Sequence, residues 1–206
     1  MLNETADKRK KKGRETATNI LAIAQRAFAE HGYESTALDD IISEARITKG
    51  ALYHHFSSKR ALFEAVYKAA EEDVSKRISN SSNSVDDPWD KLLTGCFAYL
   101  EICRDPGLRQ IMRVDAPAIL GLDRWSEIDR EYGVERLIPF LAMLRDQGIV
   151  RLSTIEAFAW QLTGAMNEAT FWIAQHSDPE RALEQSKDSL RMILQGIRQE
   201  APSDCS

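Results

Sequence analysis

Apolar side chains recur every three or four residues along almost the whole chain, which is the spacing of an amphipathic α-helix. No segment shows the alternation of apolar and polar residues that a half-buried strand would give, and no segment repeats another. Turn and capping residues divide the pattern into about nine helices. We therefore predict an all-α fold.

The first three helices are short enough to form a single small domain. The pattern predicts a helix over residues 14–31 that ends at Gly32, whose freedom at positive φ suits a C-terminal cap. A second helix should begin at Thr36, because Thr36-x-x-Asp39 resembles a capping box. A third should span residues 48–56. Two short helices with so brief a turn between them bury their apolar faces only by crossing steeply against the first, which predicts a helix-turn-helix unit.

The third helix has one side suited to DNA. At 100° per residue, Leu52 and Phe56 define its buried side, whereas Gly50 and His54 point directly away and Tyr53 flanks them. This outward face has no acid and no large aliphatic residue. Glycine permits close approach to a groove floor, and tyrosine and histidine can donate hydrogen bonds to phosphates or bases. The sequence thus predicts a recognition helix.

The remaining helices have recognisable starts and stops. The predicted boundaries are a connecting helix over 59–78, a loop at Asn80–Ser84, helix starts at Asp87-Pro88, Asp105-Pro106, Ser126, Ser153 or Thr154 and Asp178-Pro179, and ends at Gly148, near His176 and near Ile197. We expect a basic flexible arm over residues 1–13, a DNA-binding domain over 14–58 and a helical regulatory and dimerisation domain over 59–206.

The distribution of charge supports this division. The net charge is −5, but residues 1–60 carry 11 Lys and Arg against 8 Asp and Glu, whereas the remainder carries 16 against 24. One basic end on an acidic body favours contact of that end with a polyanion. The basic arm would follow the DNA backbone or a minor groove, or remain a solvated tail.

Enzyme and cofactor chemistry has no support in the motifs. The chain has no Gly-rich phosphate loop, no GxSxG and no HExxH, and His54 and His55 point about 100° apart on one helix. Cys96, Cys103 and Cys205 are odd in number and form no CxxC pair, so we expect neither a disulfide nor a metal site. We predict a cytoplasmic protein without catalysis, cofactor or membrane span, since no signal peptide or apolar run of about 20 residues is present.

The chain resembles the tetracycline-repressor (TetR) family of bacterial regulators over residues 15–65. The matching residues are Gly32-Tyr33-Glu34-Ser35-Thr36, Leu38-Asp39-Asp40-Ile41, Ile47-Thr48-Lys49-Gly50-Ala51-Leu52-Tyr53-His54-His55-Phe56, Lys59 and Leu62. The resemblance implies phosphate contacts from Thr36, Tyr53, His55 and Lys59, and positions nearest the base edges for Thr48, Lys49, Gly50 and His54. Alternatively, His55 packs against the domain and Tyr53 covers its core.

One position departs from the family pattern. Arg46 stands in the turn where the family often has glycine. A left-handed conformation there would cost about 1 kcal/mol, which a phosphate contact by Arg46 would offset.

The acidic part resembles the family's C-terminal domain only in length and helix pattern. The family's members are usually homodimers that bind a small molecule and then release DNA. The best candidates for a dimer interface are Trp160, Gly164, Ala165, Glu168, Trp172, Leu183, Leu190, Ile193, Leu194 and Ile197. Candidate walls of an effector pocket are Trp89, Phe97, Leu100, Met112, Arg113, Asp115, Trp125, Phe140, Met143 and Phe171. Both sets also fit ordinary core packing, and Arg113 and Asp115 fit either ligand contacts or an ion pair.

Three hypotheses follow. The favoured one is a dimeric repressor that a small apolar or aromatic effector releases from a palindromic operator in double-stranded DNA. The second is a DNA-binding regulator with no ligand switch. The third is an enzyme or ligand carrier with a vestigial DNA motif, which the intact outward face of Gly50, Tyr53 and His54 disfavours.

Overall fold

The computed structural model describes the backbone of residues 2–199 and the side chains of residues 11–199. Within this part of the chain all regular structure is helical, apart from one isolated antiparallel bridge between Val150 and Arg198. The elements are α1 (Leu2–Ser35), α2 (Leu38–Ala45), α3 (Lys49–His55), α4 (Lys59–Ser82), α5 (Pro88–Ile102), α6 (Pro106–Arg109), η1 (Gln110–Asp115), α7 (Ala116–Leu120), α8 (Leu122–Asp129), η2 (Arg130–Val134), α9 (Glu135–Asp146), α10 (Ile155–Gln175) and α11 (Pro179–Gln195).

The prediction of an all-α fold is confirmed. The segments η1 and η2 are π-helical turns that continue directly into the α-helices beside them. With α6–η1–α7 taken as one run and α8–η2–α9 as another, the described residues form nine helical runs. None of the helices among the described residues combines the length and apolarity that a membrane crossing needs.

The chain divides into two compact units. Unit 1 comprises Met1–Ala70 and Pro106–Trp125, and unit 2 comprises Glu71–Asp105 and Ser126–Ser206. This grouping cuts the chain differently from the boundary at residue 58 that we expect from the sequence. The segment Pro106–Trp125 packs with the N-terminal helices although it lies far from them in the sequence.

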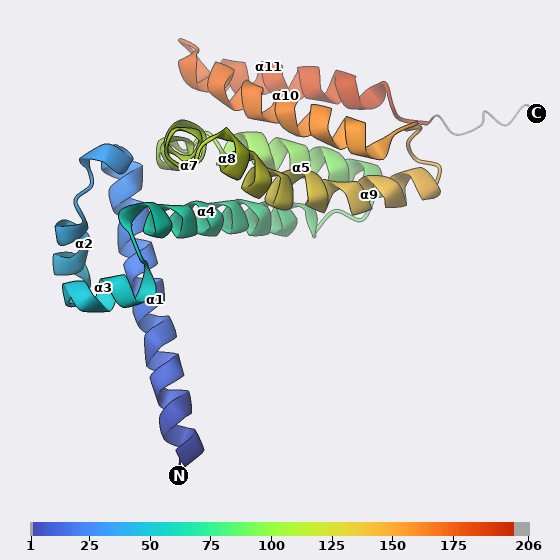
Figure 1. The fold of residues 1–206 in the computed structure, drawn as a ribbon. Coiled ribbons are helices and arrows are strands. Elements are labelled where there is room, and N and C mark those ends of the chain that lie inside the picture. The colour runs from blue at the N-terminus through green and yellow to red at the C-terminus, as the bar shows by residue number, and fades with distance from the viewer. Residues whose placement is uncertain (1, 200–206) are drawn as a thin grey trace, which may run out of the picture. The chain divides into compact units, whose positions relative to one another are not determined.

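The core of unit 1 joins four helices. Phe28 of α1, Ile41 of α2, Leu52 of α3 and Phe63 of α4 are all at most 1% exposed. Figure 1 shows α2 and α3 beside α1. Phe28 and Phe63 meet edge to face at 5.2 Å between ring centroids, a preferred geometry for aromatic pairs. This core fixes the orientation of the short helix α3.

Unit 2 is a helical bundle. Buried side chains come from α5 (Trp89, Leu100), α10 (Leu162) and α11 (Leu190, Leu194). The helices α10 and α11 run side by side (Figure 1), and both pack on α5. The apolar spacing of these segments places one side of each helix in the bundle and leaves the other exposed.

Three predicted boundaries are wrong. The helix α1 begins at Leu2 rather than near Arg14, because the Lys, Arg, Glu and Ala residues before Gly13 are good helix formers. The predicted loop at Asn80–Ser84 is helical as far as Ser82, whose hydroxyl donates to the carbonyl of Ile78. The helix expected from Ser126 begins at Leu122, because Gly121 (φ 78°) ends the preceding helix α7 and the next helix starts directly after it.

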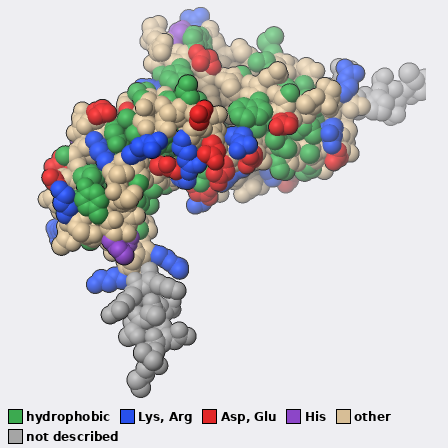
Figure 2. All heavy atoms as spheres, in the orientation of Figure 1, with side chains coloured by type: hydrophobic (Ala, Val, Ile, Leu, Met, Phe, Trp, Pro, Cys, Tyr) green, Lys and Arg blue, Asp and Glu red, His purple; other side chains and the backbone are tan. Residues whose placement is uncertain are grey.

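Charged pairs line the exposed side of α4. In unit 1, Glu64 pairs with Lys68 at 3.1 Å, and in unit 2, Glu72 pairs with Arg136 at 2.6 Å. The guanidinium of Arg136 also lies 4.7 Å from the ring centroid of Tyr132. Figure 2 shows Lys and Arg mixed with Asp and Glu on this surface. Exposed pairs of this kind each contribute about 0–1 kcal/mol to stability, so the core holds the fold.

Candidate DNA-binding interface

The turn between α2 and α3 depends on Arg46. Its backbone is left-handed (φ 53°, ψ 45°). This is the conformation considered above because the TetR family often has glycine at this position. In this geometry the amide of Arg46 donates to the carbonyl of Ser43 at 3.1 Å, and that of Ile47 donates to Ile42 at 3.2 Å. These bonds satisfy the carbonyls at the end of α2. The side chain of Arg46 is exposed beside the start of α3.

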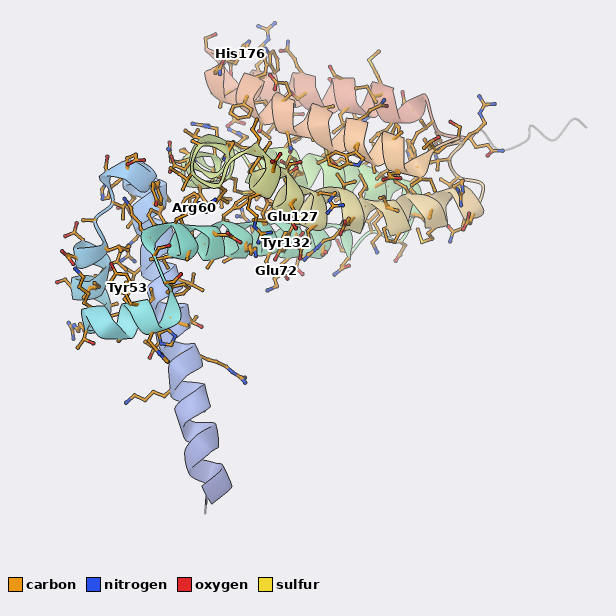
Figure 3. All side chains as sticks on the ribbon, in the orientation of Figure 1. Tyr53, Arg60, Glu72, Glu127, Tyr132 and His176 are labelled. Atoms are coloured by element: carbon orange, nitrogen blue, oxygen red, sulfur yellow. The ribbon has the colours of Figure 1, made fainter. Side chains whose placement is uncertain are left out.

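The outward face of α3 lies where the helical wheel predicts. Leu52 is fully buried, whereas Gly50, Tyr53 and His54 are exposed, and Figure 3 shows Tyr53 on α3. A Cβ added at Gly50 would meet only the Thr48 hydroxyl at 4.0 Å, so the backbone there is open to close approach. The Thr48 hydroxyl caps α3 by accepting from Ala51 N at 3.2 Å. The face can therefore approach a partner closely.

The two adjacent histidines lie in different surroundings. His54 is exposed, whereas His55 is half-buried, and its Cε1 lies 4.0 Å from the Cβ position of Gly13 on α1. The two rings are 5.3 Å apart and nearly perpendicular. Packing thus accounts for part of His55, as one of the two interpretations expects, while His54 has its ring free of the core.

Thr36 is not the N-cap of α2. The cap is Ala37, and the capping-box prediction is wrong. Thr36 is 4% exposed, and its hydroxyl lies 2.8 Å from the carbonyl oxygen of Gly32 and 3.2 Å from that of Ala27. The hydroxyl thus serves the bend after Gly32 (φ 74°). A buried hydroxyl with two internal acceptors is poorly placed for the phosphate contact that the resemblance implies.

Lys59 has partners inside the protein. Its Nζ donates to the carbonyl of Glu34 at 3.3 Å and lies 4.3 Å from the ring centroid of Tyr33. A lysine in the first turn of α4 opposes the helix dipole, and these two contacts explain its position without an external anion. Burial, and then the charge of Glu34, raise the pKa of Tyr33, so its hydroxyl stays protonated at neutral pH.

Two acidic residues of α2 pair with basic residues of α3 and α1, and these pairs were not predicted from the sequence. Asp39 lies 3.9 Å from Lys49 Nζ, and Glu44 pairs with Arg26 of α1. Asp39 lies in the first turn of α2, where a carboxylate favours the helix dipole. The side chains of Asp39 and Lys49 are both largely exposed, so this pair is weak and Lys49 can exchange it for a phosphate.

The predicted pocket residues are divided between the units. Met112, Arg113, Asp115 and Trp125 belong to unit 1, and Trp89, Phe97, Leu100, Phe140, Met143 and Phe171 belong to unit 2. In unit 1 the Trp125 indole donates to the carbonyl of Met112 at 3.2 Å. The carboxylate of Asp115 accepts from the backbone amide of Tyr33 at 2.8 Å and from Gln110 Nε2 at 2.9 Å. This contact with Tyr33 was not among the predictions, which offered a ligand contact or an ion pair for Asp115.

The predicted dimer residues are of two kinds. Trp160, Gly164, Ala165, Glu168, Trp172 and Ile193 are exposed, Ile197 is half-buried, and Leu183, Leu190 and Leu194 lie in the core of unit 2. The burial of Leu183 and Leu194 corrects their assignment, because each already packs within its own chain, whereas Leu190, 5% exposed, also lines the groove between α10 and α11. A groove of about 310 Å³ lies between α10 and α11, with Leu100 at its base and Trp172 and Ile193 on its walls. Met192, 73% exposed on α11, was not anticipated.

Comparison with known proteins bears on both parts of the chain. Residues 20–66 match the family model described as "Bacterial regulatory proteins, tetR family", and residues 89–197 match "Tetracyclin repressor-like, C-terminal domain". A TetR-family transcriptional regulator from Pectobacterium atrosepticum is 33% identical, with a TM-score of 0.78 over 92% of this chain and 97% of its own.

Two further proteins are more distant. The Tn10 TetC protein of Escherichia coli is 24% identical over 182 residues, which are 88% of this chain and 90% of that protein. RolR, solved in complex with resorcinol, is 15% identical, with a TM-score of 0.68 over 91% of this chain and 89% of its own. The likeness to RolR shows the fold alone.

Proposed function

The chain belongs to the TetR family of DNA-binding transcriptional regulators, and from that premise we propose that it is a homodimeric repressor released from a palindromic operator by a small apolar or aromatic effector. The family is not one of enzymes. The proposal has three parts, which are reading of DNA by α3, pairing of two chains through α10 and α11, and release by an effector.

The outward face of α3 carries the first part. Gly50 leaves room for close approach, and Tyr53 and His54 offer hydrogen-bond donors on the same exposed side. Donors of this kind suit phosphates and base edges, and α3 itself carries no acid to repel DNA. Thr48, Lys49 and Arg46 are exposed beside this face and would add contacts. Lys59 and His55 contribute less, because both are already engaged within unit 1.

The second part rests on the exposed side of α10 and α11. Trp160 is 42% exposed, Trp172 45% and Ile193 51%, and of these Trp172 and Ile193 line the groove. Gly164 has open space where a Cβ would stand, which lets another helix approach closely. A second copy of the chain, with its own α10 and α11, would cover these side chains in a four-helix arrangement.

The third part is the effector. Trp89 and Leu100 are buried in unit 2, and Phe97, Phe140 and Phe171 are half-buried there, so an apolar or aromatic molecule would find apolar neighbours. The complex of RolR with resorcinol supports an aromatic ligand on this fold. An effector acts only if it binds one arrangement of the chain more tightly than the other.

Selection of bound sites from random duplex DNA tests the proposal. We expect the full chain to enrich a palindrome with half-sites about one helical turn, roughly 34 Å, apart. A gel-shift titration with that palindrome and resorcinol, followed by a panel of small aromatic compounds, tests release. Enrichment of no sequence would contradict reading by α3. An asymmetric site would contradict the dimer, and an operator affinity unchanged by the whole panel would favour a regulator with no ligand switch.

A further inference from the structure

We propose that Asp115 is a positioning residue that holds the DNA-reading helices in place, by accepting a hydrogen bond from the backbone of Tyr33 across the break in α1. The inference rests on the proposed function and deepens it, because it names the contact that regulates the reading helix. All the residues involved belong to unit 1.

The break in α1 at Gly32 leaves the backbone amide of Tyr33 in need of an acceptor from outside the helix. Gly32 has φ 74° and ψ 168°, a conformation that is essentially restricted to glycine. The helix can therefore not continue its regular hydrogen bonds through this point, and the amide of Tyr33 donates to Asp115 Oδ2 at 2.8 Å. Asp115 lies 82 residues further along the chain, so the bond closes a long-range contact rather than a local turn.

The carboxylate of Asp115 is itself held in place. Gln110 Nε2 donates to its other oxygen at 2.9 Å. Gln110 and Asp115 are the first and last residues of the π-helical turn η1. In a regular α-helix, residues five apart would point about 140° away from each other. The wider π-turn brings the two side chains together on the side that faces Gly32.

The fit at this contact is close. A Cβ at Gly32 would lie 3.4 Å from Gln110 Nε2 and 3.7 Å from Asp115 Oδ2. These are ordinary van der Waals distances, so the backbone conformation, and not the approach of η1, is what requires glycine here. A shift of η1 away from Tyr33 by more than about 0.5 Å would stretch this 2.8 Å bond past the usual range of N–H···O distances.

The contact leads directly to the helix-turn-helix. The carbonyl of Gly32 accepts from the Thr36 hydroxyl, and that of Tyr33 accepts from the Thr36 amide at 3.3 Å, immediately before α2. The Tyr33 ring packs edge to face on Phe63 of α4, 5.2 Å between centroids, and carries Lys59 above it. Asp115 thus fixes the residue on which both the start of α2 and the first turns of α4 are built.

A second pair of bonds ties the same segment to α4. The guanidinium of Arg60 donates to the carbonyls of Ile119 and Leu120, each at 3.1 Å, where α7 ends. Figure 3 shows Arg60 at the start of α4. These bonds keep Pro106–Trp125 attached to unit 1 when Asp115 is replaced, so a variant at Asp115 should loosen the junction rather than unfold it.

The experiment compares D115A and D115N with the exposed control D123N of α8. Amide hydrogen exchange at Tyr33 reports the bond directly, and operator affinity with its salt dependence reports the reading helices. For D115A we expect Tyr33 exchange to accelerate and operator affinity to fall, each about tenfold, because a net hydrogen bond to a charged group is lost. The salt slope should stay unchanged, because the phosphate contacts themselves remain.

D115N separates positioning from mere structure. Its amide oxygen still accepts from Tyr33, and Gln110 can turn its own amide to accept from the new NH₂ group. We expect D115N to keep operator affinity within about threefold of the wild type. D123N should match the wild type in both measurements, and its failure to do so would mean that loss of any nearby charge suffices, which overturns the proposal.

Three other results would overturn it. They are tight operator binding by D115A, a protected Tyr33 amide in D115A, and a loss of affinity that only follows the unfolded fraction. If D115A fails to fold, the operator affinity of D115N and the hydrogen exchange of Tyr33 in the wild type test the proposal instead. A rapidly exchanging Tyr33 amide in the wild type contradicts the hydrogen bond to Asp115. A wild-type chain that enriches no duplex contradicts the proposed function, and Tyr33 exchange then decides the role of Asp115 alone.

Discussion

Removal of the Trp172 ring should break the pairing of two chains. Trp172 is 45% exposed on α10 and lines the groove beside α11. A tryptophan side chain buries up to about 250 Å², so roughly 100 Å² of the Trp172 ring is exposed in the single chain and would be buried by a second copy. At about 25 cal/mol per Å² the contact contributes about 2.5 kcal/mol. A two-fold interface contains the contact twice, so W172A should cost about 5 kcal/mol and weaken self-association by more than about 1,000-fold.

Sedimentation velocity over a wide range of protein concentration measures this change. The matched control is L122A, because Leu122 is 70% exposed on α8 in unit 1 and lies outside the groove. We expect L122A to sediment as the wild type does and W172A to sediment as a monomer at micromolar concentration. Circular dichroism should show the same helix content in all three proteins, since the ring is half exposed. A W172A protein that pairs as tightly as the wild type would refute the assignment of the interface.

The other predictions concern single side chains. Y53A should weaken binding to all duplexes alike, about tenfold, whereas H54A should also change the selected sequence, as competition gel shifts would reveal; equal effects on every sequence contradict the assignment for His54. The hydrogen bond from Arg124 lowers the pKa of Glu64 below 4.5, so the stability it adds is present above that pH and is lost as pH falls through the lowered value. Thermal unfolding of E64Q should therefore differ from the wild type at pH 6 and converge in acid, and a constant difference would contradict this. Burial raises the pKa of Cys96 to about 12, so iodoacetamide should label it at pH 8 only after unfolding, as peptide mass spectrometry would show.

The local geometry of the reading unit could be predicted from its sequence. The wheel places Leu52 inside and Gly50 and His54 outside because a short amphipathic helix has only one apolar side to bury. The left-handed conformation of Arg46 was raised by the resemblance to the TetR family, which often has glycine in this turn. The prediction for Thr36 was wrong. A threonine near the start of a helix is typical of an N-cap, whereas the Thr36 hydroxyl donates a hydrogen bond to the carbonyl of Gly32.

Long-range contacts could not be predicted in the same way. The bond from Tyr33 to Asp115 joins positions 82 residues apart, and no periodicity or capping rule relates such positions. Asp115 therefore looked like a residue for a ligand or an ion pair. In the same way, the spacing of apolar residues on a helix does not predict whether Leu194 or Ile193 faces the core. The structure buries the first completely and leaves the second 51% exposed.

The size of the Asp115 contact suits a regulatory role. An effector that lowers operator affinity about tenfold, the loss expected for D115A, needs a coupling free energy of about 1.4 kcal/mol. Hydrogen bonds to charged groups each contribute about 1.5–3 kcal/mol. The bond from Tyr33 to Asp115, together with the one from Gln110 that orients it, therefore lies in the required range. Release would need only the displacement of η1 from Gly32, and the buried core around Phe28, Leu52 and Phe63 would stay intact. A switch that unfolded this core would demand far more free energy than binding of one small molecule supplies.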